Sequence, residues 1–73
     1  MDIIVEYAGG RIFALEVKAT ASPNKEDARH ILWLRNQVGD RFVGGAVLHT
    51  GPKAFELDER VAALPISALW AMG

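Results

Sequence analysis

The sequence predicts a small α/β domain in which a β-hairpin is followed by a helix, a parallel strand and a short returning strand. Three observations predict this fold. β-Branched and aromatic residues flank a Gly-Gly turn near the amino terminus. A stretch of helical period occupies residues 25–38, and residues 42–48 are apolar at nearly every position. The strand–helix–strand order implies a right-handed crossover and therefore a small mixed sheet.

The composition limits the size and the class of the protein. Its 73 residues suit one small domain with a marginal core. Hydrophobic residues make up 51% of the chain, which argues against disorder and suggests a surface for a partner. The formal net charge of −1 provides no basic field for nucleic acid, although a site can be locally basic in a neutral chain.

The residue types that are missing narrow the chemistry further. The chain has no cysteine, so disulfides, thiolate zinc sites and cysteine nucleophiles are excluded. Its first apolar run is only three residues long, which is too short for a signal peptide. No apolar run approaches the roughly 18–20 residues that cross a bilayer. We therefore expect a cytoplasmic protein that is not embedded in a membrane.

The hairpin has two conceivable registers, and the loop length decides between them. Its strands are expected at residues 3–7 and 11–19. A two-residue loop would mix acidic and apolar side chains on both faces. A three-residue Ala-Gly-Gly loop instead pairs Ile3 with Leu15 and brings Asp2 beside Glu16. We expect the second register because it sorts the apolar side chains onto one face.

The second hairpin strand has two different faces. Alternate side chains of a strand share a face, so Phe13, Leu15 and Val17 lie together and are expected to face the core. The opposite face ends in Glu16 and Lys18. An apolar strand that carries an acid and a lysine on one face near its end is either solvated there or holds a site.

The helix has recognisable ends and one apolar side. Ser22 or Asn24 can cap residues 25–38, and Gly39 suits a left-handed stop. Its apolar stripe comprises Ala28, Ile31, Leu34 and Val38, with Leu32 on the shoulder. Arg35 lies near the middle of this stripe, so we expect it to reach an acid or a ligand.

The second half of the chain adds strands but little cover for the sheet. We expect a short returning strand at residues 54–57, an extended piece at residues 61–64 and one helical turn at residues 68–70. The apolar strand 42–48 calls for cover on both faces, yet the chain offers one long helix. Either the C-terminal segment or another chain covers the second face. We expect another chain, and hence a homo-oligomer, with a dimer favoured.

Several other residues receive simpler interpretations. His30 and His49 are far apart in sequence and lack an acid or a cysteine at metal-ligand spacing. Trp33 points away from the apolar stripe and is a candidate for contact with a partner. The basic residues are interpreted as a solvated face, with contact to a phosphate backbone as the alternative; they are Lys25, Arg29, Arg35 and Arg41.

The predicted register brings three polar groups together. Asp2 and Glu16 offer the hard oxygen ligands that suit Mg²⁺ or Mn²⁺, and the backbone carbonyl of Val17 adds another oxygen. Lys18 is placed to position a water or to neutralise a transition state. This chemistry indicates phosphodiester hydrolysis. The alternative is an exposed Glu-x-Lys ion pair worth roughly 0–1 kcal/mol.

The same residues resemble a known superfamily. Asp2, then Glu16-Val17-Lys18 after a hairpin, then a helix and a parallel strand, resembles the core of the PD-(D/E)XK nucleases. That resemblance implies a partial restriction-endonuclease-like fold. It also implies that Asp2 and Glu16 bind the metal and that Lys18 assists catalysis.

A closer resemblance covers nearly the whole chain. Four of its segments are similar to the C-terminal end of prokaryotic AAA-type ATPases, which carries an uncharacterised nuclease-like domain. These segments are Gly10-Arg11 with Glu16-Val17-Lys18-Ala19, Gly39-Asp40-Arg41-Phe42-Val43, Val47-Leu48-His49-Thr50-Gly51 and Leu64-Pro65-Ile66-Ser67-Ala68-Leu69-Trp70. The resemblance implies that residues 1–73 form a single nuclease-like domain without the helix and strand that precede the metal-binding Asp in that family.

Two functions follow from these observations. The first is a nuclease-like domain whose Mg²⁺-dependent or Mn²⁺-dependent site is vestigial or conditional. The alternative is a non-catalytic module for oligomerisation or protein interaction. No nucleotide is expected, because Gly9-Gly10-Arg11 has neither the length nor the Gly-Lys-Ser/Thr ending of a Walker loop.

Overall fold

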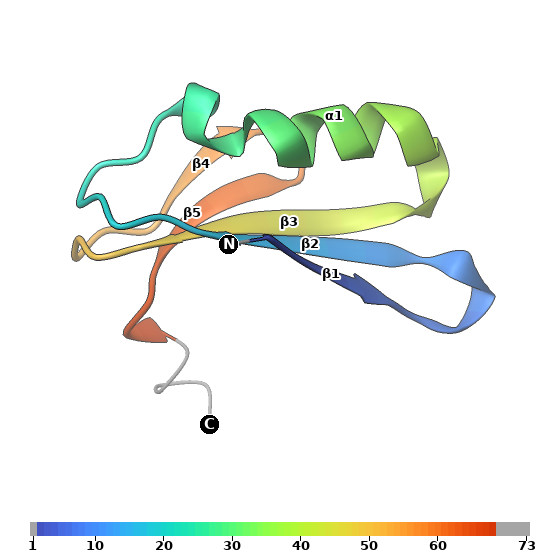
Figure 1. The fold of residues 1–73 in the computed structure, drawn as a ribbon, viewed down its shortest axis with the longest axis horizontal. Coiled ribbons are helices and arrows are strands. Elements are labelled where there is room, and N and C mark those ends of the chain that lie inside the picture. The colour runs from blue at the N-terminus through green and yellow to red at the C-terminus, as the bar shows by residue number, and fades with distance from the viewer. Residues whose placement is uncertain (1, 69–73) are drawn as a thin grey trace.

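The computed structural model describes residues 2–68, except for the side chain of Asp2. Its elements are β1 (Asp2–Glu6), β2 (Ile12–Val17), α1 (Arg29–Val38), β3 (Phe42–His49), β4 (Phe55–Asp58) and β5 (Val61–Pro65). One mixed sheet has the strand order β1-β2-β3-β5-β4, with α1 lying across one of its faces (Figure 1). Strands β2, β3 and β5 are parallel, and the edge strands β1 and β4 are antiparallel to them. The predicted α/β fold is confirmed.

The hairpin adopts the register that separates acidic from apolar side chains. Ile3 pairs with Leu15, and the backbone of Asp2 pairs with Glu16, as predicted. The connection is the three-residue turn Ala8–Gly10, whose two glycines have φ angles of 83° and 76°. Glycine adopts positive φ angles without the steric cost that most other residues have. The Gly-Gly pair therefore fixes the loop length and, with it, the register.

The helical segment begins and ends where its capping residues lie. A 3₁₀ turn at Lys25–Ala28 leads directly into α1. Asn24 accepts a hydrogen bond from the backbone N–H of Asp27, and the Asp27 carboxylate accepts one from the backbone N–H of Asn24. This reciprocal capping box satisfies amide groups that the first turn leaves without partners. Gly39, with φ of 59°, ends the helix.

The core lies between α1 and the face of the sheet that it covers. Ile31 projects from α1 onto the buried side chains of Phe42, Val47 and Val61. A Cβ atom at Gly45 would lie 2.6 Å from Cγ2 of Ile31, so the missing side chain lets the helix approach β3 closely. The predicted apolar stripe is confirmed, because Ala28 and Ile31 are buried while Leu32, Leu34 and Val38 pack beside them.

The prediction of which face of β2 is buried is wrong. The side chains that lie under α1 are those of Ile12, Ala14 and Glu16, which are 8%, 1% and 5% exposed. The side chains on the other face are only partly buried; they are Phe13, Leu15 and Val17. Alternation separates the two faces but does not say which one receives the helix. Small side chains on the Ala14 face make room for α1, whereas the ring of Phe13 lies over Gly44 on the other face.

The C-terminal half differs from the prediction in detail. Strand β3 extends one residue further than expected, to His49, and β4 begins and ends one residue later than expected. Strand β5 lies between β3 and β4 and is parallel to β3. Of the expected helical turn at residues 68–70, only Ala68 falls within the described residues. Between residues 2 and 68, no helix is long and apolar enough to cross a membrane.

Candidate functional site

A buried acid lies at the carboxyl end of β2. Glu16 is 5% exposed although its side chain is an acid, and it pairs with Val47 of β3 on one side and with the backbone of Asp2 on the other. Burying a carboxylate costs several kcal/mol unless cations or hydrogen-bond donors compensate. We expected this end of the strand either to be solvated or to hold a site. Because Glu16 is buried, its side chain is not simply solvated.

The compensating cation is the lysine two residues later. Nζ of Lys18 lies 3.4 Å from Oε1 of Glu16, because side chains at positions i and i+2 of a strand share a face. The Lys18 side chain is 39% exposed, whereas that of Glu16 is 6% exposed. The backbone N–H of Lys18 donates a hydrogen bond to the carbonyl of Leu48, so the extended conformation continues past the end of β2. The buried carboxylate therefore has a half-exposed ammonium beside it.

The oxygen donors around Glu16 are few among the described residues. Within the described residues, no three His, Cys, Asp or Glu side chains form a cluster that holds a metal ion, and the Asp2 side chain lies outside this description. The described part of the chain supplies the Glu16 carboxylate and the Val17 carbonyl. Mg²⁺ usually keeps several waters and takes only one or two carboxylates. Both donors are oxygens, which is the type of ligand atom that Mg²⁺ and Mn²⁺ prefer.

A second buried polar residue lies at the end of the neighbouring strand. His49 is 1% exposed, and its Nδ1 accepts a hydrogen bond of 3.0 Å from the backbone N–H of Gly51. A neutral imidazole that accepts at Nδ1 carries its proton on Nε2 and has no lone pair there for a metal. The spacing of His49 in the sequence indicates no metal ligand and assigns it no other role. The available signal was a polar residue at the end of an otherwise apolar run.

The basic residues of the helix are mostly held by acids. Lys25 and Arg35 both contact Asp58 of β4, at 3.1 Å and 3.0 Å. Arg29 forms an ion pair with Glu26 at 2.9 Å. The prediction that Arg35 reaches an acid is confirmed. Ion pairs satisfy three of the four basic residues considered for phosphate contact, which favours the structural interpretation for them.

The Asp58 carboxylate is stabilised by three neighbouring groups. The backbone N–H of Glu59 donates to its carboxylate, and Lys25 and Arg35 supply two cations. The Glu59 hydrogen bond first, and then the two basic side chains, hold the pKa of Asp58 well below its usual range. This cluster joins the amino-terminal turn of the helical segment to the β4–β5 hairpin and has a structural role.

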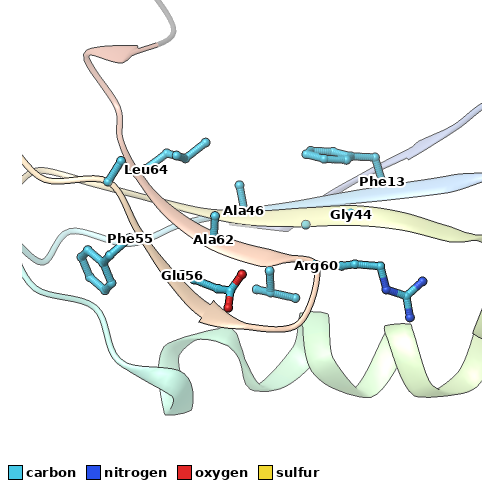
Figure 2. Close-up of a pocket in the computed structure, with 11 residues that line it drawn as sticks. Phe13, Gly44, Ala46, Phe55, Glu56, Arg60, Ala62 and Leu64 are labelled. Carbon is cyan, nitrogen blue, oxygen red and sulfur yellow. The ribbon is translucent and has the colours of Figure 1, made fainter.

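Two apolar hollows flank the sheet. One, of about 320 Å³, lies between α1 and β1 and is lined by Ile4, Trp33, His30 and their neighbours. Ile4 and Trp33 are 54% and 62% exposed, which confirms that Trp33 points away from the core. The other hollow, of about 470 Å³, lies along β3 and β5 and includes Phe13, Ala46 and Leu64, which point away from the helix (Figure 2).

Comparison with known proteins identifies the family. No curated protein and no solved structure matches the chain. One family model matches residues 1–69, almost the whole chain, and that family is commonly found at the C-terminus of AAA-type ATPases. The chain therefore belongs to the family described as "Domain of unknown function (DUF4143)".

Proposed function

We propose that the chain is a nuclease-like domain with a metal-dependent phosphodiesterase site at the carboxyl end of β2. The observation that carries the proposal is the buried Glu16 carboxylate with the Lys18 ammonium 3.4 Å away. The register adds Asp2 on the adjacent strand. An acid, a buried acid and a lysine on neighbouring strands match the residue types that the PD-(D/E)XK resemblance implies, and that resemblance supports the proposal.

Each residue has a defined part in the proposed site. Asp2, Glu16 and the Val17 carbonyl would hold Mg²⁺ or Mn²⁺. When bound, the ion lowers the pKa of a water and stabilises negative charge on a phosphoryl oxygen. Lys18 keeps an ammonium beside this position, where it orients the attacking water and neutralises developing charge. Burial of Glu16 keeps its carboxylate fixed in one place, so little reorganisation is needed before reaction.

Metal binding and strand cleavage together test this proposal. Calorimetry with Mn²⁺ should detect binding at millimolar or lower concentration, and Glu16→Gln should weaken that binding at least tenfold. Nicking of supercoiled DNA and cleavage of single-stranded RNA should both depend on Mn²⁺ and should both be lost in Lys18→Met. Glu26→Gln is the matched control, because Glu26 also pairs with a basic residue but lies exposed on the helical segment. Wild-type protein that neither binds Mn²⁺ nor cleaves either substrate would remove the catalytic proposal.

A second candidate function is supported by the exposed apolar surface. The hollow between α1 and β1 and the partly exposed face opposite α1 both carry aliphatic and aromatic side chains. Such surfaces are typical of interaction sites. In this function the chain is a non-catalytic module that forms a homodimer or docks on a larger protein. Light scattering at micromolar concentration tests the first possibility, and a monomer at all concentrations contradicts it.

A further inference from the structure

The loops that follow β2 and β3 are joined to each other, and His49 lies at the junction. His49 is the last residue of β3 and is 1% exposed. Its Nδ1 accepts a hydrogen bond from the N–H of Gly51, so the backbone turns back over the imidazole ring. The ring also lies 5.9 Å from that of Phe55, at an interplanar angle of 43°. Packing and one hydrogen bond therefore fix the orientation of the imidazole.

Gly51 in turn packs closely against the loop that follows β2. A Cβ atom at Gly51 would lie 2.1 Å from the carbonyl oxygen of Ala21, which leaves no room for any side chain. The N–H of Thr50 donates a hydrogen bond of 2.9 Å to the carbonyl of Thr20. Both contacts fall just after Lys18 in the chain. The end of β3 therefore determines where the β2 exit loop runs.

We infer that His49 is a positioning residue, which fixes the loop after Lys18 through Gly51 and so holds Lys18 beside Glu16. This inference rests on the proposed function only for the role of Lys18 in chemistry. His49 acts through the loop rather than on a metal, because accepting at Nδ1 places the proton on Nε2. That Nε2 has no hydrogen-bond partner among the described residues, which leaves the Nδ1 bond as the polar contact that orients the ring.

Two substitutions of His49 separate this role from simple packing. In His49→Asn the side-chain oxygen takes the place of Nδ1 and still accepts from Gly51. His49→Leu fills a similar space without an acceptor. Amide hydrogen exchange at Gly51 and Thr50, followed by NMR, should be about tenfold faster in the leucine variant, as expected when a local opening replaces a hydrogen bond. The asparagine variant should stay within about threefold of the wild type.

The core strand supplies the internal reference. Exchange at Val47, which lies in the centre of β3, should be unchanged by His49→Leu. Equal acceleration at Val47 and Gly51 would show a global loss of stability and would overturn the inference. Identical exchange in the asparagine and leucine variants would overturn it as well.

A second route keeps the inference testable if the leucine variant does not fold. Gly51→Ala retains His49 but forces the backbone away from Ala21, so Thr50 should exchange faster by a similar factor. Unchanged exchange at Thr50 in this variant would contradict the proposed connection. Nicking or Mn²⁺ binding forms a separate arm. If the wild type lacks both, the proposed function fails, while the exchange measurements still decide the role of His49.

Discussion

Both faces of the sheet carry apolar side chains, but α1 covers one face and leaves the other partly exposed. Under α1, Phe42, Val47 and Val61 are at most 1% exposed and form the centre of the core. On the opposite face, Phe13 and Leu15 are only partly buried, and no helix or strand of residues 2–68 covers them. Burial stabilises in proportion to the apolar area removed from water. Substitutions under α1 should therefore act on folding, and those at the partly exposed side chains of the open face should act mainly on association.

The buried polar groups lie on the covered side of the sheet. Glu16 and His49 are both on the covered side of the chain, at the carboxyl ends of two adjacent parallel strands. Their burial is costly, so each has a specific partner, Lys18 for the acid and Gly51 for the imidazole. The open face carries no comparable buried charge among the described residues. The covered face therefore contains both the centre of the core and the residues of the candidate site.

The largest effect is expected from emptying the centre of the covered face. Phe42→Ala removes a ring that is 1% exposed and should lower the free energy of unfolding by about 3–5 kcal/mol. Urea denaturation followed by circular dichroism measures this change. Val43→Ala, at a neighbouring side chain that is 44% exposed, is the control and should cost less than about 1 kcal/mol. Equal costs at both positions would contradict the contrast between the faces.

Two adjacent glycines of β3, Gly44 and Gly45, face opposite sides of the sheet. Gly45→Ala places a methyl group 2.6 Å from Ile31 and 3.1 Å from Phe42, so the helix must move, and about 1–3 kcal/mol of stability should be lost. Gly44→Ala points to the other face, where the nearest atom is the Phe13 ring at 3.1 Å. That side chain can shift toward open space. Thermal denaturation should therefore show a clearly lower Tm for the Gly45 variant than for the Gly44 variant.

Low pH should reduce the stability of the folded protein, because protonation of Asp58 removes its interactions with Lys25 and Arg35. The pKa of this carboxyl is lowered in the folded state, so its stabilising effect is complete above its ordinary value of 3.8. It is lost as the pH falls from there toward the lower folded pKa. Urea midpoints measured between pH 5 and pH 2 should fall less steeply in Asp58→Asn than in the wild type. Asp40→Asn, at an exposed acid, should follow the wild-type slope.

The smallest effect on stability is expected on the open face. Ile3→Thr keeps a β-branched residue on β1 and replaces a side chain that is 41% exposed. The free energy of unfolding should therefore change by about 0.5 kcal/mol or less. If the open face mediates self-association, the same variant should dissociate at higher concentration than the wild type in sedimentation experiments. A loss of several kcal/mol in a monomer would mean that this face is part of the core.

Local sequence signals predicted much of the fold. The Gly-Gly turn and the sorting of acids from apolar residues gave the hairpin register, including the pairing of Asp2 with Glu16. Capping by Asn24 and the left-handed Gly39 gave both ends of the helical segment. These features depend on residues close together in the chain, so their physical causes can be read directly from the sequence.

Of the candidate site, the sequence determined the shared face of Glu16 and Lys18, because a strand alternates its side chains. Long-range packing determines that this face is the covered one, that His49 is buried beside the exit loops and that Asp58 is the acid that Arg35 reaches. Both faces of β2 are apolar over most of their length, so period alone could not choose between them. Helix docking made that choice, because Ala14 and Gly45 leave room for Ile31 only on one side.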